Sequence, residues 1–286
     1  MRIRRLGIVA PIAGAVLVVG GLFTQSVGFA AGSTSPVWQG GVSNFNTPAW
    51  LAAWGLKASD NVANGCKGAT ASYSCDWGYP GTQQTDPTTP GGNLVPVADA
   101  TAPGGDGALL VKYPAPSGPP SCKCNLGGGQ FYQYATVAPG LTSLATSTTM
   151  DLKYYYNMPT NFDFGGGGAW GKMPGLWGGG IPGCESGAQH CAGGWSTRYM
   201  WRGLTTGGAA GEVYWYTAAG GGFGADLGVG SWTWHADGKW HSIEQSVDIV
   251  SGQILVWQDG AQVFNMKETF PAGSFPSGIF LSTFHG

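Results

Sequence analysis

Residues 240–266 read W-H-S-I-E-Q-S-V-D-I-V-S-G-Q-I-L-V-W-Q-D-G-A-Q-V-F-N-M, and this stretch decides the fold. Trp240–Ile249 and Gln253–Gln258 are runs of strand-forming residues on either side of a Ser251-Gly252 turn, which is a strong hairpin signal. Asp259-Gly260 is a second tight-turn signal, and it leads into a further run of the same kind. Three strands joined by short turns predict an antiparallel sheet.

Strand patterns of the same kind follow one another from residue 147 to the end of the chain. Residues 150–156 alternate apolar and polar side chains with a period of two, which is typical of a half-buried strand. Trp195–Arg202 and Glu212–Tyr216 are the next strong runs. Beyond the N-terminal segment only residues 47–57 have a helix start signal, so we expect less than about a tenth of the protein to be helical.

The composition fits one large β domain. The 52 glycines and 18 prolines are spread along the chain, as expected for many short strands joined by turns. No internal repeat indicates a propeller or a solenoid. We therefore predict an all-β fold: a single antiparallel β-jelly-roll sandwich (concanavalin-like) over residues 31–286.

Residues 1–30 have the pattern of a secretory signal peptide. Arg2, Arg4 and Arg5 precede a long apolar run, and small residues follow up to Ala30, where we expect cleavage. A membrane anchor is the alternative, because the apolar run approaches spanning length. Its Gly and Pro content and the small residues after it favour cleavage. We therefore expect a secreted, extracellular protein with no membrane association after cleavage.

The charge balance limits the partners of the mature chain. Removal of the signal leaves 10 basic residues against 15 acidic ones, a net charge of −5. This balance argues against binding to nucleic acid or to an anionic membrane. The mature chain keeps two arginines, Arg198 and Arg202, four positions apart in one segment. A polyanion is therefore expected to bind only at a local basic site.

Six cysteines in an exported chain predict three disulfides. Two of them close a short loop, whereas the two flanking Lys123 are too close to pair with each other comfortably. The expected bridges are Cys184–Cys191 and two among Cys66, Cys75, Cys122 and Cys124. Neither the cysteines nor the four histidines have the spacing of zinc ligands, so we expect no metal and no cofactor.

Two of the expected strands carry polar side chains that can meet. Ser196 and Arg198 share one face of their strand, and Tyr214 and Tyr216 share one face of theirs. If the glycine-rich stretch 203–211 folds the two strands into a hairpin, these four side chains gather on one wall. On spacing alone the alternative is a solvated sheet face on which arginines pack against tyrosines.

A lysine lies in an unusual setting at Gly171–Gly180, which reads G-K-M-P-G-L-W-G-G-G. Glycines allow a close approach between backbone and ligand, so Lys172 is a candidate binding residue. A phosphate-binding loop is the obvious alternative, but no G-K-[ST] ending and no following helix support it.

Four ordered motifs carry a family resemblance. Gly171–Gly180 resembles the K-[LM]-P-G-L-[YW]-G-G signature of family 14 polysaccharide lyases and the related glucuronan lyases. The S-x-R strand at 196–198, the Y-x-Y strand at 214–216 and the F-L-S-T-F stretch at 280–284 match the family in the same order. The similarity spans residues 147–286, about half of the chain.

The resemblance implies a β-jelly roll that cleaves uronic-acid polymers, such as alginate or polyglucuronate, by β-elimination. By position in the motifs, it assigns the catalytic functions to Lys172, Ser196, Arg198, Tyr214 and Tyr216. Elimination removes the proton α to a carboxylate, and a cation on that carboxylate, with a hydroxyl donor beside it, can stabilise the charge that develops. Either tyrosine can serve as the base or the acid. The expected partner is an acidic polysaccharide, bound by a monomer.

The end of the chain departs from the family pattern. The family's closing motif runs S-T-F-F-G-G and continues into a further strand, whereas residues 282–286 read S-T-F-H-G. We expect either a fragment or a missing last strand, which would leave a sheet edge unpaired. His285 stands where an aromatic residue is expected.

Two other functions compete with a lyase. A sandwich-fold glycoside hydrolase needs two carboxylates about 5–10 Å apart. Glu244 and Asp248 share a strand face but are too widely spaced for a retaining pair. A non-catalytic carbohydrate-binding protein explains the 13 tryptophans and 11 tyrosines equally well, but it has no need of a Lys/Ser/Arg/Tyr/Tyr set.

Overall fold

The computed structural model of the whole chain describes residues 14–23, 38–39, 94–103, 107–113, 128–134, 147–179, 193–206, 208–217 and 224–285. Every regular element in these ranges is a β-strand, which confirms the all-β prediction. No helix in these ranges is long and apolar enough to cross a membrane. The six cysteines, His190, the cleavage position Ala30 and residues 47–57 lie outside the described residues.

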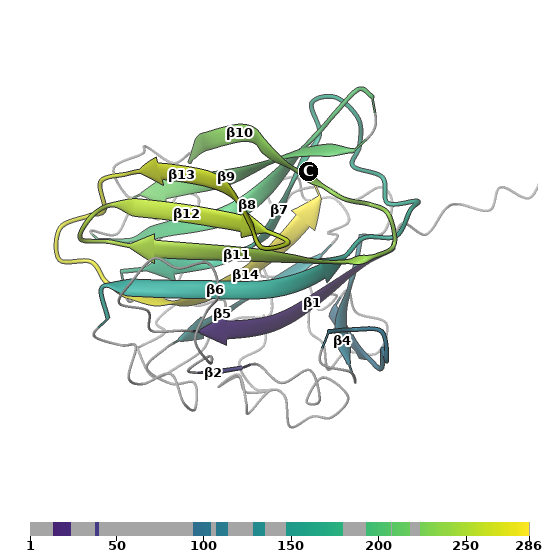
Figure 1. Cartoon of the computed structure of the whole chain (residues 1–286), viewed down its shortest axis with the longest axis horizontal. Helices are drawn as coiled ribbons and strands as arrows, with labels where there is room; N and C mark the ends of the chain where they lie inside the picture. The colour runs from purple at the N-terminus through teal and green to yellow at the C-terminus, as the bar shows by residue number, and fades with distance from the viewer. Residues whose placement is uncertain are drawn as a thin grey trace, which may run out of the picture.

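The strands form two antiparallel sheets that pack face to face (Figure 1). The eight-stranded sheet contains β1 (Gly14–Phe23), β2 (Trp38–Gln39), β3 (Leu94–Val97), β4 (Ala108–Lys112), β6 (Thr149–Asn157), β11 (Trp240–Asp248), β12 (Gln253–Gln258) and β13 (Ala261–Lys267). Its order is β13-β12-β11-β6-β1-β4-β3, with β2 beside β1. The six-stranded sheet contains β5 (Gly129–Tyr134), β7 (Trp170–Gly178), β8 (Trp195–Gly203), β9 (Ala209–Thr217), β10 (Ala225–Trp234) and β14 (Pro276–His285). Its order is β10-β9-β8-β7-β14-β5, and the two sheets make a jelly-roll sandwich.

The hairpins of residues 240–266 form as their turn residues predict. β11 pairs with β12, and β12 pairs with β13, all antiparallel. Asp259 and Gly260 both adopt positive φ angles, 50° and 80°, as a type I′ turn requires. Gly252 also has a positive φ of 76°, and a Cβ there would collide with the backbone oxygen of Glu268. The turn chemistry thus fixes the register of the three strands.

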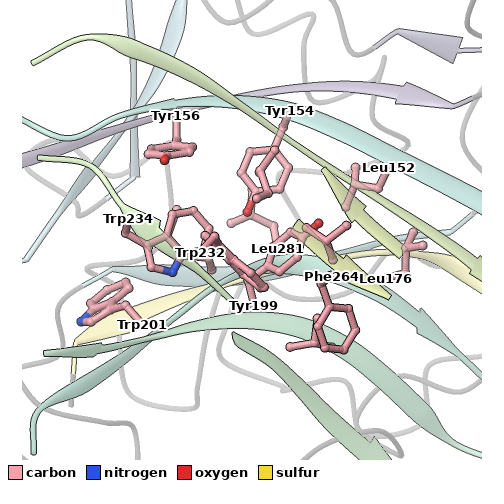
Figure 2. Close-up of a cluster of buried hydrophobic side chains, with 14 of the residues drawn as sticks. Leu152, Tyr154, Tyr156, Leu176, Tyr199, Trp201, Trp232, Trp234, Phe264 and Leu281 are labelled. Atoms are coloured by element: carbon pink, nitrogen blue, oxygen red, sulfur yellow. The ribbon is translucent and has the colours of Figure 1, made fainter. Parts of the chain in front are cut away.

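The core lies between the sheets and is unusually aromatic. On β6, the period-two alternation places four fully buried side chains toward the other sheet: Met150, Leu152, Tyr154 and Tyr156. Figure 2 shows Leu152, Tyr154 and Tyr156 facing large side chains of the six-stranded sheet. Tyr154 approaches Tyr199 with ring centroids 6.2 Å apart, and Tyr156 meets the edge of Trp234 at 5.0 Å. These contacts between large side chains fix the position of β8 relative to the eight-stranded sheet. They therefore also fix the polar residues on the other face of β8.

A buried glutamine connects the sheets beneath the candidate site. The side-chain oxygen of Gln245, on β11, accepts hydrogen bonds from the hydroxyl of Thr197 at 2.6 Å and the backbone N–H of Leu176 at 3.4 Å. Its amide nitrogen donates to the backbone oxygen of Thr197 at 2.8 Å. Gln245 is fully buried, so these bonds replace solvation that the amide has lost. One side chain of the eight-stranded sheet therefore fixes both β7 and β8.

The apolar run expected to belong to a signal peptide is a strand in the whole chain. β1 pairs with β6 on one side and with β4 on the other. Both a signal peptide and a strand inside a sheet can have an apolar sequence, so the composition alone fits either. Cleavage near Ala30 stays a prediction, and it would remove β1 from between β6 and β4.

Candidate active site

The predicted wall of polar residues exists. β8 and β9 form an antiparallel hairpin in which Ser196 pairs with Tyr216 and Arg198 pairs with Tyr214. The alternate residues of the two strands, such as Tyr199 and Trp215, are buried in the core between the sheets. Because side chains alternate across a strand, the four polar residues share the opposite face of the six-stranded sheet.

Lys172 joins this face because β7 contains a bulge. Its register against β8 shifts between Met173 and Leu176, so that three steps along β7 match two along β8. The extra residue lets Met173 and Leu176 both enter the core, while Lys172, paired with Met200, lies on the polar face. A strict period of two would have placed Lys172 and Leu176 on the same face.

The glycines of this motif serve strand packing. A Cβ on Gly175, within the bulge, would collide with the backbone of Thr197 and of Arg198. Cβ atoms on Gly171 and Gly178 would enter the rings of Trp201 and Trp195. The sequence had suggested close approach to a ligand, but in the structure these glycines allow β7 to approach β8 and its tryptophans. Tyr154 completes the arrangement by donating a hydrogen bond to the Pro174 oxygen at 3.2 Å.

Lys172 is buried against the two tyrosines. Its nitrogen lies 3.5 Å from the ring centroid of Tyr214 and 6.0 Å from that of Tyr216. Burial lowers the pKa of Lys172 well below its usual value, and the guanidinium groups of Arg198 and Arg202 lower it further. An amine in this setting can release its proton at much lower pH than a surface lysine, and can therefore also accept one.

Arg198 is held between aromatic rings and a serine. Its guanidinium carbon lies 4.5 Å from the ring centroid of Phe280 and 5.9 Å from that of Tyr216. One terminal nitrogen donates to the hydroxyl of Ser282 at 3.3 Å. Within the described part of the chain, its Nε has no hydrogen-bond partner although it is buried. A guanidinium with a spare donor is suited to bind a carboxylate.

The hydroxyl of Tyr214 has a backbone partner. It accepts a hydrogen bond from the N–H of Gly224 at 2.9 Å, and a Cβ on Gly224 would collide with the tyrosine ring. Tyr214 remains partly exposed, whereas Tyr216 is 4% exposed, and the two ring centroids are 5.7 Å apart. Tyr214 thus combines solvent contact with a hydroxyl that the backbone holds in place.

Sequence reasoning did not assign Glu212 to the site. It lies two residues before Tyr214 on the same strand face and is fully buried. One carboxylate oxygen accepts a hydrogen bond from Nε of Arg202 at 2.9 Å, and Arg202 also pairs with Asp226 at 2.6 Å. Burial raises the pKa of Glu212 to about 7, although Arg202 acts to lower it. The only sequence signal was its position in the E-x-Y-x-Y alternation.

The last strand of the chain lies inside the six-stranded sheet. β14 pairs with β5 on one side and β7 on the other, and β5 forms the edge of the sheet. A fragment or a missing further strand stays a prediction. His285 takes the place of an aromatic residue by packing its ring edge-on against Trp201, with centroids 5.9 Å apart. Its Nε2 also lies 3.1 Å from the backbone oxygen of Asp163.

The residues that other chemistries would need do not gather at this wall. Glu244 and Asp248 lie on β11, in the other sheet, and Glu244 pairs with Lys153 at 3.5 Å. The described ranges hold no group of three or more His, Cys, Asp or Glu side chains placed to bind a metal ion. The chemistry available at the wall is that of an amine, a guanidinium, a serine hydroxyl, two phenols and a carboxyl group.

Comparison with known proteins gives one family match. The model of the polysaccharide lyase 14 family matches residues 101–286. Among solved structures, a mutant of alginate lyase Aly36B in complex with alginate trisaccharide is 17% identical, with a TM-score of 0.44 over 57% of this chain and 68% of that chain. The endo-β-1,4-glucuronan lyase of the fungus Trichoderma reesei is 10% identical, with a TM-score of 0.42 over 67% of this chain and 74% of that chain. None of the curated proteins matches the chain.

Proposed function

The chain belongs to the polysaccharide lyase 14 family, and we propose on this basis that it cleaves a uronic-acid polysaccharide, such as alginate or polyglucuronate, by β-elimination outside the cell. The observation that supports an acidic substrate is a buried pair of basic residues, Lys172 and Arg198, on a chain that is otherwise acidic. A polymer with one carboxylate per sugar supplies the counter-charge at each position along the wall.

Arg198 neutralises the carboxylate beside the scissile bond. Its guanidinium is fixed by Ser282 and Phe280 and has a buried donor to spare, so it needs little reorganisation when substrate binds. Ser196, fully buried on the same strand face, contributes a second donor to this carboxylate. As the proton leaves the neighbouring carbon, charge moves onto the carboxylate, where both donors stabilise it.

Proton transfer is assigned to Lys172 and the two tyrosines. A base removes the proton at C5, the electron pair forms the C4–C5 double bond, and the C4–O bond breaks as an acid protonates the leaving oxygen. Two kinds of group can take the C5 proton: a tyrosine acting as its phenolate, and the neutral amine of Lys172. We assign the acid to Tyr214, because its hydroxyl is oriented by the N–H of Gly224 and its side chain keeps solvent contact.

The test is an assay of the purified mature protein on a panel of polyuronates and neutral glucans. The unsaturated uronate product absorbs in the ultraviolet, so its appearance on a polyuronate, and not on a glucan, supports the proposal. Arg198→Met is the matched control, because it removes the guanidinium while keeping an apolar stem of similar length. If the protein binds polysaccharides of the panel but forms unsaturated product from none of them, the result would instead favour a carbohydrate-binding protein.

Secretion is a separate part of the proposal. It rests on the basic and apolar N-terminal sequence, and N-terminal sequencing of the exported protein tests it. A mature chain that starts near residue 31 supports export through a cleaved signal. A chain that keeps residues 14–23 would show instead that β1 is a permanent strand.

A further inference from the structure

A buried carboxylate lies in a wall that should attract carboxylates. Glu212 is fully buried, and its second carboxylate oxygen has no hydrogen-bond partner within the described part of the chain. An ionised carboxylate in such a place costs free energy unless other groups compensate for it. It would also repel a polyanionic substrate. The mechanism above gives Glu212 no task, so its position calls for an explanation.

The charged groups around Glu212 come from every strand packed against it. Met200 on β8 separates it from Lys172 on β7, since Met200 pairs with both residues. The groups that face it are Arg202 and Arg198 from β8, Lys172 from β7, Asp226 from β10 and Tyr214 from its own strand. The cluster therefore brings two guanidinium groups and the amine of Lys172 together with two carboxyl groups.

We propose that Glu212 is a positioning residue of the lyase reaction, which acts through Lys172 by controlling how readily that buried amine takes up and releases a proton. The inference rests on the proposed function. Arg202 fixes one oxygen of Glu212, so its charge has a defined place two strands away from Lys172 and beside Tyr214. Without that charge, only the weaker influence of Asp226 opposes the effects of burial and the two arginines on Lys172.

The electrostatics agree with this geometry. Burial is the largest influence on Lys172 and lowers its pKa, Arg198 and Arg202 lower it further, and Glu212 acts in the opposite direction more strongly than Asp226 does. The influence is mutual, because Lys172 in turn acts to lower the pKa of Glu212. Two coupled groups share a titration, and substitution of one must shift that of the other.

The test compares Glu212→Gln with Asp226→Asn. Both variants replace a carboxylate that binds Arg202 with a neutral amide, but Asp226 is 43% exposed and more weakly coupled to Lys172. For Glu212→Gln we expect kcat to fall by at least about tenfold near neutral pH and the acid limb of the pH–rate profile to move to lower pH. KM should stay the same or fall, since a repulsive charge has been removed. Asp226→Asn should change all three quantities much less.

A second readout does not depend on turnover. Nuclear magnetic resonance of ¹³C-labelled lysine side chains, with Lys172→Arg to assign the signal, follows the titration of Lys172 itself. We expect that titration to move to lower pH in Glu212→Gln. An unchanged Lys172 titration, or equal effects of the two variants, overturns the inference even if the enzyme is active. If the wild type cleaves no polyuronate, the proposed function fails, and the titration still decides the coupling.

Discussion

The nitrogen of Lys172 lies 3.5 Å from the centroid of the Tyr214 ring, although their strands are separated by β8. The contact passes over Met200, which pairs with Lys172 across the β7–β8 ladder. A cation this close to a desolvated ring face is attracted to it by about 2 kcal/mol, and the attraction is lost when the amine gives up its proton. The protonation of Lys172 and the position of Tyr214 are therefore coupled.

This coupling predicts the effect of removing the amine. Lys172→Met keeps most of the stem and its packing but removes the proton carrier, so kcat should fall by at least about a hundredfold. Binding of the polyuronate should weaken as well, because one positive charge is lost from the wall. Steady-state kinetics and equilibrium binding measure the two effects. Lys153→Met is the control, because Lys153 is in the other sheet and pairs with Glu244, and it should leave both quantities nearly unchanged.

Removal of a tyrosine hydroxyl should reduce turnover far more than it weakens polymer binding. Tyr214→Phe and Tyr216→Phe each remove one hydroxyl, and at least one variant should lose more than about 99% of kcat while it still binds polymer. Tyr214 is the stronger expectation, because it is partly exposed to solvent, whereas Tyr216 is buried with 4% exposure. Both variants should retain the wild-type circular dichroism spectrum. If both cleave at near wild-type rates, the assignment of proton transfer to this hairpin is wrong.

The arginine should not be replaceable by lysine. Arg198→Lys keeps the charge, but it loses the planar fork and the stacking against Phe280. We expect kcat/KM to fall by about 10²–10³, as for the loss of one preoriented donor to the developing charge. The effect should persist at high salt, since the lost contact is buried. A loss that disappears at high ionic strength would instead indicate long-range attraction of the polymer.

The parts of this site that the sequence predicted are those set by local rules. The period of two placed Ser196 with Arg198, and Tyr214 with Tyr216, and the hairpin then brought the two pairs together. The loop is shorter than the glycine-rich stretch suggested, because β9 already begins at Ala209.

The parts that the sequence did not predict depend on contacts between distant segments. Ser282, Gly224 and Glu212 reach the wall only through the order of strands in the sheet, which no local pattern specifies. The bulge in β7 is another case, because it is set by the packing of Gly175 against the backbone of Arg198. The N-terminal apolar run is ambiguous for a different reason, since export signals and strands inside a sheet can share an apolar composition.

Gln245 should matter for stability and not for chemistry. Gln245→Met has similar volume but leaves the hydroxyl and carbonyl of Thr197 and the N–H of Leu176 without their buried partner. We expect the free energy of unfolding to fall by about 2–4 kcal/mol in urea titrations. Gln253→Met removes a glutamine with exposed hydrogen bonds and should cost no more than about 0.5 kcal/mol. Equal losses in the two variants would show that the inter-sheet bonds contribute little.

Glu212 should make the stability of the protein depend on pH in a specific direction. Its pKa is raised by burial from an ordinary value of 4.5 to about 7 in the folded protein, so between these values the folded state holds the proton more tightly than the unfolded state. The resulting stabilisation is complete below pH 4.5 and is lost as the pH rises through about 7. Glu212→Gln cannot titrate, so its stability relative to wild type should improve by roughly 1–3 kcal/mol between pH 4.5 and pH 8. Urea unfolding of both proteins at several pH values measures this difference. A difference that stays constant over the whole range would mean that Glu212 titrates in the folded protein as it does in the unfolded chain.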